Sequence, residues 1–226
     1  MKNRTVSVGI GFVVMAAFVA SLAAGAGKAR FPNPERDEPA APAVSERSIV
    51  LAGGCFWGVQ AVFQHVKGVI SATSGYAGGS AGTASYVMVS FGTTGHAESV
   101  RVAYDPSQLT LGQLLKVFFS VAHDPTEVNR QGPDDGPQYR SVIFYTSQEQ
   151  LAIARAYLAQ LSAAKVFRRA IATDVVPLRG FYPAEAYHQD YVDHHPFDPY
   201  IVRNDLPKLD ALRKEYPELY VDHRPR

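Results

Sequence analysis

One cysteine of this 226-residue chain stands where reaction at sulfur is favoured. Cys55 follows Gly53 and Gly54 at the end of a short apolar run, SIVLA, and precedes a stretch with helical spacing. The glycines allow a tight turn, and the partial positive charge of a helix N-terminus favours the thiolate, which is the reactive form. Phe56 and Trp57 follow directly and could form an aromatic wall beside the sulfur. A free cysteine is more often a small buried hydrophobic residue, but these neighbours predict a nucleophile.

Further blocks along the chain resemble one known family. After GCFWG come SGYAGG, Tyr86, TGHAESVRV, YDP, HDPT, RQGPDDGPQYRS and YHQDY. Their order and spacing are similar to those of the A-type peptide methionine sulfoxide reductases. The resemblance covers residues 47–200, and because many blocks occur in order, it is far more specific than the GCFWG motif alone. It implies a two-layer α+β sandwich.

The same resemblance implies roles for the cysteine and for three residues around it. Cys55 matches the nucleophile, and Phe56 and Trp57 match the pocket that receives the methyl group of the sulfoxide. Glu98 matches the acid that protonates the sulfoxide oxygen, which is a poor leaving group until it carries a proton. A glutamate surrounded by aromatic rings can have a raised pKa and remain protonated near neutrality. Taken alone, Glu98 would be a solvated charge at the start of a strand.

Three further residues match supporting roles in that family. Tyr86 and Tyr139 match phenols that donate hydrogen bonds to the sulfoxide oxygen, and Asp134 matches a supporting carboxylate. Without the resemblance, the tyrosines would be ordinary half-buried residues. Asp134 lies in a Gly-Pro loop, where aspartate usually serves turn formation, and its neighbour Asp135 competes for any acidic role.

The implied activity is thiol-dependent reduction of methionine S-sulfoxide, free and in proteins, as repair of oxidative damage. The reaction would pass through a cysteine sulfenic acid, with no bound cofactor, and thioredoxin, glutaredoxin or glutathione would restore the thiol. The spacing of His188, His194 and His195 fits no standard zinc motif, so we expect a hydrogen-bonded aromatic cluster rather than a metal site. The balanced charge, with 22 basic and 21 acidic residues, gives no case for nucleic acid binding.

The chain departs from the family pattern at two places. Many members carry glutamate where this chain has Gln60, which is not the position matched to the proton donor. Many members also have resolving cysteines near the C-terminus, whereas no cysteine follows Tyr200 here. An internal disulfide is therefore impossible, and recycling must depend on an external thiol.

Other functions remain open from the residues alone. A single-cysteine peroxidase would want a cation beside the thiol, and no Arg or Lys lies between Arg47 and Lys67. A Cys-His hydrolase lacks a histidine in a recognisable catalytic block. A module that binds oxidised methionine without turnover would result if Glu98 or Tyr139 were displaced.

The elements that must position these residues alternate between strand and helix. We expect an α+β fold, a two-layer α/β sandwich with a mixed, largely antiparallel sheet, helices on one face and a ferredoxin-like core. Thr110 is predicted to cap one long helix and Ser147 to begin another, and Pro177 predicts an edge strand. The predicted strands are 48–54, a run within 68–79, 98–104, 140–145 and 173–178; the predicted helices are 56–65, 110–122, 147–164 and 206–216; residues 123–138 are predicted to be a loop.

The N-terminus is typical of an export signal. Lys2 and Arg4 precede an apolar run over residues 6–26, and Ala24-Gly25-Ala26 has the small-x-small form of a cleavage site. The run is long enough to span a bilayer if it is not removed. We therefore expect an exported, periplasmic protein, anchored in the membrane by residues 6–26 only if cleavage fails.

The predicted organisation has four parts. Residues 1–27 form the signal peptide or anchor, and residues 28–46 form a linker rich in proline and alanine. Residues 47–200 form the catalytic domain, and residues 201–226 form a tail without a resolving cysteine.

Overall fold

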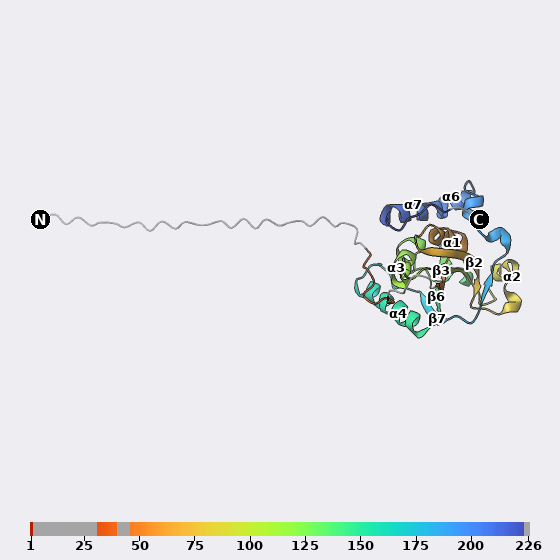
Figure 1. Cartoon of the computed structure of the whole chain (residues 1–226), viewed down its shortest axis with the longest axis horizontal. Coiled ribbons are helices and arrows are strands. Elements are labelled where there is room, and N and C mark those ends of the chain that lie inside the picture. Colours follow the sequence, from red (N-terminus) through yellow and green to blue (C-terminus); the bar gives the residue numbers. More distant parts are fainter. Residues whose placement is uncertain (2–30, 40–45, 224–226) are drawn as a thin grey trace. The chain divides into compact units, whose positions relative to one another are not determined.

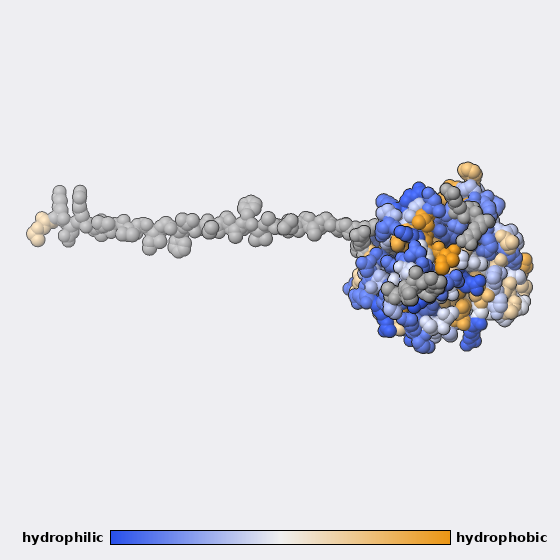
Figure 2. All heavy atoms as spheres, in the orientation of Figure 1, coloured by the Kyte–Doolittle hydropathy of each residue, from blue (hydrophilic) through white to orange (hydrophobic). Residues whose placement is uncertain are grey.

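The computed structural model describes Met1 and residues 31–39 and 46–223, and the described residues from Phe31 onward form one compact unit. The predicted export segment, residues 1–27, lies outside the described residues apart from Met1. Among the described residues, the model contains no helix whose length and hydropathy would let it cross a bilayer. The face of the folded unit in Figure 2 is mostly hydrophilic, with a few small apolar groups.

Six strands form the main sheet, in the order β7-β6-β1-β3-β2-β8. All neighbours are antiparallel except β6 and β7, which are parallel. A separate ribbon pairs β4 with β5. The strands are β1 (Arg47–Gly53), β2 (Val69–Ala77), β3 (Ala97–Tyr104), β4 (Arg130–Gln131), β5 (Asp134–Asp135), β6 (Ser141–Tyr145), β7 (Asp174–Pro177) and β8 (Phe181–Pro183).

Helices cover one face of the sheet (Figure 1). They are α1 (Phe56–Gln64), α2 (Tyr86–Ser90), α3 (Leu111–Val117), α4 (Gln148–Ala163), α5 (Tyr191–His194), α6 (Pro199–Asn204) and α7 (Leu206–Glu215). A π-helical turn, Phe118–Ala122, continues α3, and 3-10 turns occupy Ala81–Thr83, Pro137–Tyr139 and Ala186–His188. Helix α1 packs on β2 and β3, and α7 packs against α1.

The central strands confirm the predicted fold class. Their order is β6-β1-β3-β2, with α1 connecting β1 to β2 and α3 lying between β3 and β6. This is the βαββαβ arrangement of a ferredoxin-like core. Strand β7 extends it at one edge, where Pro177 costs no hydrogen bond of a central ladder.

The two faces of the sheet are buried differently. Alternate residues such as Ile49 and Leu51 point into the large core beneath the helices, whereas Val50 and Ala52 point into a small cluster on the other face. The large core includes most of the buried aromatic side chains. Helical coverage of one face is therefore reflected in the size of the two clusters.

Both predicted helix starts are confirmed. The hydroxyl of Thr110 accepts a hydrogen bond from the backbone N–H of Gln113, whose own side chain accepts from the Thr110 N–H, so a capping box is complete. The hydroxyl of Ser147 accepts from the N–H of Gln150 at the start of α4. These local contacts explain why the helices begin where the sequence indicates.

The folded unit extends beyond the predicted domain on both sides. Within the predicted linker, the Glu38 carboxylate is buried and accepts hydrogen bonds from Arg47, Tyr104 and the backbone N–H of Leu111. The carboxylate would be costly to bury without these partners. The described part of the linker, residues 31–39, is thus packed against the domain.

The predicted C-terminal tail is also part of the folded unit. Ile201, Leu212 and Tyr216 are all buried, and Leu212 and Tyr216 belong to the main core. Only the helix at 206–216 was expected in this region, and it is α7. Strand β8 and helices α5 and α6 are too short to give a periodic pattern, and the ribbon β4–β5 lies inside the predicted loop 123–138 for the same reason.

Candidate active site

Cys55 lies where strand β1 ends and helix α1 begins. It is the N-cap residue of α1, with φ −52° and ψ 125°, and only 8% of its surface is exposed. Gly54 makes the turn with φ +94°, and a Cβ there would meet the side chain of Gln131 at 2.5 Å. Other residues would therefore be both strained and crowded at this position. The glycines before the cysteine serve the turn, as predicted.

The thiol itself is neutral in this structure. Burial raises the pKa of Cys55 well above its ordinary value, and the charges of Glu98 and Asp205 raise it further. The backbone N–H of Trp57 at the helix N-terminus lowers this pKa, but it contributes less than burial does. The helix N-terminus thus favours the thiolate, as predicted, but desolvation outweighs it.

Glu98 stands directly beside the cysteine. It is 3% exposed, near the start of β3, and its Oε2 accepts a hydrogen bond of 3.0 Å from the backbone N–H of Phe56. Burial raises its pKa to about 8, the Phe56 N–H opposes this, and the charge of Asp134 adds to it. The predicted raised pKa is confirmed, so the carboxyl carries a proton at neutral pH and can donate it.

Two phenols complete the polar side of the site. Tyr86 begins α2 and Tyr139 ends a 3-10 turn, and burial raises the pKa of each, followed by the charge of Glu98. The charge of Cys55 also raises both pKa values. Both hydroxyls therefore stay protonated near the sulfur and can act as neutral donors.

Asp134 rather than Asp135 faces this group. Burial raises the pKa of Asp134, and its Oδ2 accepts a hydrogen bond of 2.5 Å from the Tyr200 hydroxyl. Asp135 is exposed. Adjacent residues on the short strand β5 point in opposite directions, which separates the two candidates that the sequence left together.

Aromatic rings form the apolar side. Trp57 is half-buried and stacks on Tyr191 with ring centroids 3.7 Å apart, while the Tyr200 ring meets it edge-on at 5.9 Å. Phe56 is fully buried against Tyr76, with centroids 5.8 Å apart. The two residues of the motif thus lie at different depths.

His188 belongs to this aromatic cluster, as expected. Its Nδ1 accepts a hydrogen bond of 3.1 Å from the indole N–H of Trp57, and its ring packs on Phe56 and Tyr86. Burial lowers its pKa, so the ring is neutral and carries its proton on Nε2. Among the described residues, no group of three or more His, Cys, Asp or Glu side chains is placed to hold a metal ion.

Several residues of the site were not predicted. Tyr200, Tyr191 and the pair Asp205 and Lys208 come from the C-terminal helices, and all act electrostatically on Cys55 or contact Trp57. The block YHQDY includes Tyr191, which was the one signal that pointed to this region. Nothing in the spacing of residues 200–208 distinguishes them from a surface helix.

Gln60 connects α1 to the segment that follows β8. It is 2% exposed, its amide donates to the Ala72 carbonyl and to Gln189 Oε1, and its Oε1 accepts from the N–H of Asp190, each at 3.0 Å. All its hydrogen-bonding groups are used in this way. The residue has a structural position one turn beyond Cys55.

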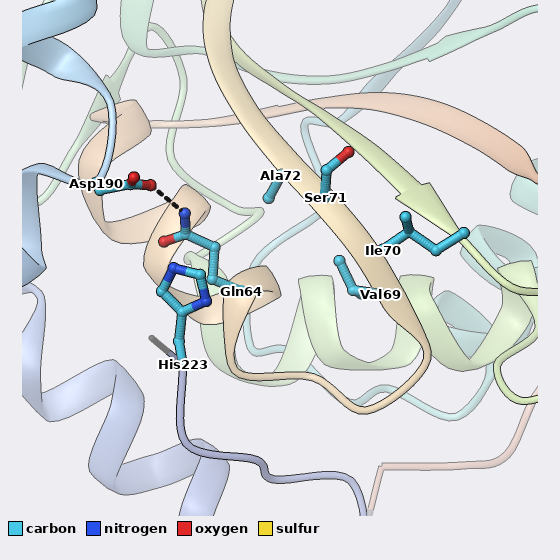
Figure 3. Close-up of a pocket in the computed structure, with 7 residues that line it drawn as sticks. All are labelled: Gln64, Val69, Ile70, Ser71, Ala72, Asp190 and His223. Carbon is cyan, nitrogen blue, oxygen red and sulfur yellow. Dashed lines mark hydrogen bonds between the residues drawn. The ribbon is translucent and has the colours of Figure 1, made fainter. Parts of the chain in front are cut away.

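A separate cavity of about 180 Å³ lies at the other end of α1 (Figure 3). Gln64, the last residue of α1, donates to Asp190 across it, and His223 and the start of β2 line its sides. None of the predicted catalytic residues lines this cavity. It is therefore not the place where the chemistry predicted for Cys55 occurs.

Comparison with known proteins supports the arrangement described above. Residues 47–219 match the family model described as peptide methionine sulfoxide reductase. The chain belongs to this family. Peptide methionine sulfoxide reductase MsrA 2 of Mesorhizobium japonicum is 55% identical over 82% of this chain and 94% of its own length, and MsrA of Thermus thermophilus is 47% identical over 77% and 97%.

Solved structures agree. The chain is similar to Mxr1 from Saccharomyces cerevisiae in reduced form, with a TM-score of 0.61 and 34% identity over 73% of this chain and 92% of that one. It is also similar to methionine sulfoxide reductase A of Corynebacterium diphtheriae, with a TM-score of 0.60 and 35% identity over 69% and 77% of the two chains. The resemblance inferred from the motifs, the fold class and the class of enzyme are confirmed.

Proposed function

We propose that this protein reduces methionine sulfoxide, with Cys55 as nucleophile and Glu98 as proton donor. One observation carries the proposal: the buried carboxyl of Glu98, with a pKa of about 8, is held 3.0 Å from the backbone N–H of Phe56, the residue after Cys55. An acid that is protonated at neutral pH thus stands beside the sulfur. This is the pair of groups that sulfoxide reduction requires.

The reaction balances with these two groups. The Cys55 sulfur bonds to the sulfoxide, Glu98 gives its proton to the oxygen, and the thiol proton replaces the one that Glu98 has lost. The S–O bond of the substrate then breaks and its oxygen passes with its proton to the Cys55 sulfur, while the bond between the two sulfurs breaks and methionine leaves. The substrate sulfur is reduced by two electrons, and Cys55 is oxidised to sulfenic acid. Because the resting thiol is neutral, proton transfer and attack must be coupled.

The surrounding residues orient the substrate. The hydroxyls of Tyr86 and Tyr139 donate to the sulfoxide oxygen and stabilise the charge that develops on it. Trp57 and Phe56 supply apolar surface for the methyl group. Since the two epimers exchange the positions of methyl and oxygen, this arrangement selects one of them, and the resemblance to the family implies that it is the S epimer. Free methionine sulfoxide and oxidised proteins are both substrates.

Recycling depends on an external thiol, because the chain has one cysteine. A thiol of glutathione, thioredoxin or glutaredoxin attacks the sulfenic sulfur and releases water, and a second thiol resolves the mixed disulfide. We further propose that the protein works after export, in the periplasm, and is held at the membrane only if residues 6–26 are retained.

A single-turnover assay tests the proposal. Without reductant, each chain should convert one methionine S-sulfoxide and then be trapped by a sulfenic-acid reagent, while the R epimer should remain. With dithiothreitol, turnover should continue. Two equivalents of methionine per chain without reductant would show that the oxidising equivalents are stored somewhere other than Cys55.

A further inference from the structure

Asp205 stands between α6 and α7 in an unusual environment. It is 0% exposed and is the N-cap residue of α7, yet its side chain makes no capping hydrogen bond. Instead its Oδ1 accepts from Lys208 Nζ at 3.0 Å, and its Oδ2 has no hydrogen-bond partner among the described residues. The ordinary reason for aspartate at a helix start is therefore missing.

The pair is pressed against the helix that begins at Cys55. A Cβ on Gly58 would lie 2.0 Å from Asp205 Oδ1 and 2.7 Å from Lys208 Nζ. Gly58 is in the first turn of α1, three residues after the cysteine. Only a residue without a side chain allows the two charges to approach this turn so closely.

A gain in stability is not the expected role of the pair. A buried ion pair is often no more stabilising than apolar residues of the same volume, since both charges lose their hydration. Lys208 also lies in the first turn of α7, where the helix dipole disfavours a cation. The pair must therefore be considered for its effect on its neighbours.

We propose that Lys208, anchored by Asp205 against the first turn of α1, is a positioning residue that stabilises the thiolate of Cys55. The proposal rests on the proposed function only in assigning the nucleophile. The cation would act each time the thiolate forms: when it attacks the sulfoxide, and when it leaves as the mixed disulfide is resolved. A lower-energy thiolate is a better leaving group.

The charge of Lys208 acts on the pKa of Cys55 in the direction that the proposal requires. Lys208 lowers the pKa of Cys55, whereas burial, Glu98 and Asp205 raise it. The other titratable groups that interact electrostatically with Cys55 are Tyr86, Tyr139, Tyr191 and Tyr200. Those that interact with Lys208 besides Cys55 and Asp205 are Asp134 and His123.

The chain offers a direct test, because its single cysteine makes alkylation report on one site. The rate of Cys55 alkylation by iodoacetamide should be measured against pH in the full-length protein. Lys208→Met should raise the apparent pKa by about one pH unit, so the rate below the pKa falls about tenfold. Lys208→Arg should restore the profile.

Lys214→Met is the matched control, since it removes the same charge from an exposed position on the same helix. Its profile should coincide with that of the unmodified protein. If Lys208→Met and Lys214→Met coincide, Lys208 has no electrostatic role. If Lys208→Met does not fold by circular dichroism, Lys208→Gln, which removes the charge and keeps a polar group beside Asp205, is measured in its place. A profile that coincides with that of Lys214→Met then overturns the proposal.

Alkylation does not require sulfoxide reduction, so the two proposals fail separately. A protein that alkylates as expected but leaves methionine sulfoxide unchanged would contradict the proposed function and retain the role of Lys208. If the protein is active but Lys208→Met leaves the alkylation profile unshifted, only the role of Lys208 is contradicted, and the proposed function stands.

Discussion

Two regions contribute to the same site in different ways. One is the junction of β1 and α1, and the other is the segment from the 3-10 turn Ala186–His188 to the end of α7, residues 186–215. At the junction, Cys55, Phe56 and Trp57 are consecutive, and one strand–turn–helix unit positions all three. In the later segment, Tyr191 lies in α5 and Tyr200 lies in α6. Both contact Trp57, Tyr191 by stacking and Tyr200 edge-on. The first region is local, and the second is assembled by packing.

The difference teaches which property each kind of region controls. The local unit determines which atom reacts, because the turn and the helix start place one sulfur there. The packed segment affects the protonation of that atom, because Asp205 raises the pKa of Cys55 and Lys208 lowers it. Burial is the largest effect on the pKa values of both Cys55 and Glu98. Substitutions in one region should therefore disrupt its property without removing the property that the other region controls.

The largest effect should come from the local unit. Cys55→Ser should abolish sulfoxide reduction completely, because the chain has no other thiol, while the fold stays intact since serine has nearly the same shape. Methionine formation measured with dithiothreitol, together with a circular dichroism spectrum, checks both statements. Activity above a buffer blank would remove Cys55 from the mechanism.

Glu98→Gln should have the next largest effect. The amide cannot give up a proton, so single-turnover reduction should slow by about 10²–10⁴, the range for a general acid. Its Oε1 can still accept from the Phe56 N–H, so the hydrogen bond at 3.0 Å is retained. Rapid-quench measurement of methionine provides the rate, and an unchanged rate would place the acid elsewhere.

The same substitution should stabilise the protein at alkaline pH. With a pKa of about 8 in the folded state, Glu98 binds its proton more tightly folded than unfolded. The contribution of this tighter proton binding to the free energy of unfolding is fully present below the pKa of the unfolded state. It is lost as the pH rises through about 8, the pKa of the folded state. Thermal unfolding should therefore give Glu98→Gln a higher Tm than wild type at about pH 9, with no such gain at about pH 4. A difference in Tm between Glu98→Gln and wild type that is the same at both pH values would contradict the raised pKa.

A smaller effect is expected from the packed segment. Tyr200→Phe removes the hydrogen bond to Asp134 and should lower the free energy of unfolding by about 1.5–3 kcal/mol, as for bonds to charged groups. Tyr187→Phe, at a largely exposed tyrosine, is the control and should change little. Urea unfolding measures both, and equal effects would show that the Tyr200 bond does not tie α6 to β5.

Gln60→Glu should have the smallest effect on chemistry. Reduction by the folded protein should change by no more than about fivefold, because Gln60 contacts no reacting group, and about 1 kcal/mol of activation free energy corresponds to this factor. Stability should fall by about 1–3 kcal/mol, because a carboxylate would face the Ala72 carbonyl and Gln189 Oε1 without a donor. A large loss of rate without loss of stability would give Gln60 a role in the reaction.

Much of the fold could be predicted because it is encoded over short distances. Thr110 and Ser147 cap the helices that follow them, and alternating residues in β1 separate two faces of the sheet. Strand β8, the ribbon β4–β5 and helices α5 and α6 could not be predicted in this way. Each is shorter than one or two periods of any pattern, and contacts with distant residues hold it in place.

The residues of the candidate site also differ in how far the sequence could predict them. Cys55 and its turn could be predicted from adjacent residues, and Glu98, Tyr86, Tyr139 and Asp134 only through a resemblance, because nothing local distinguishes them. The structure brings all five together. It also adds Tyr200, Asp205 and Lys208, whose relation to Cys55 appears only when α7 packs on α1.

The sequence by itself determined the nucleophile, the turn that presents it, and the need for an external thiol, since a single cysteine cannot form an internal disulfide. Only the tertiary structure decided that the resting thiol is neutral and that Glu98 holds its proton. The physical reason is that a pKa depends on the water excluded and the charges gathered around a group. Those neighbours come from segments far apart in the chain, as the contact of Lys208 with the turn after Cys55 illustrates.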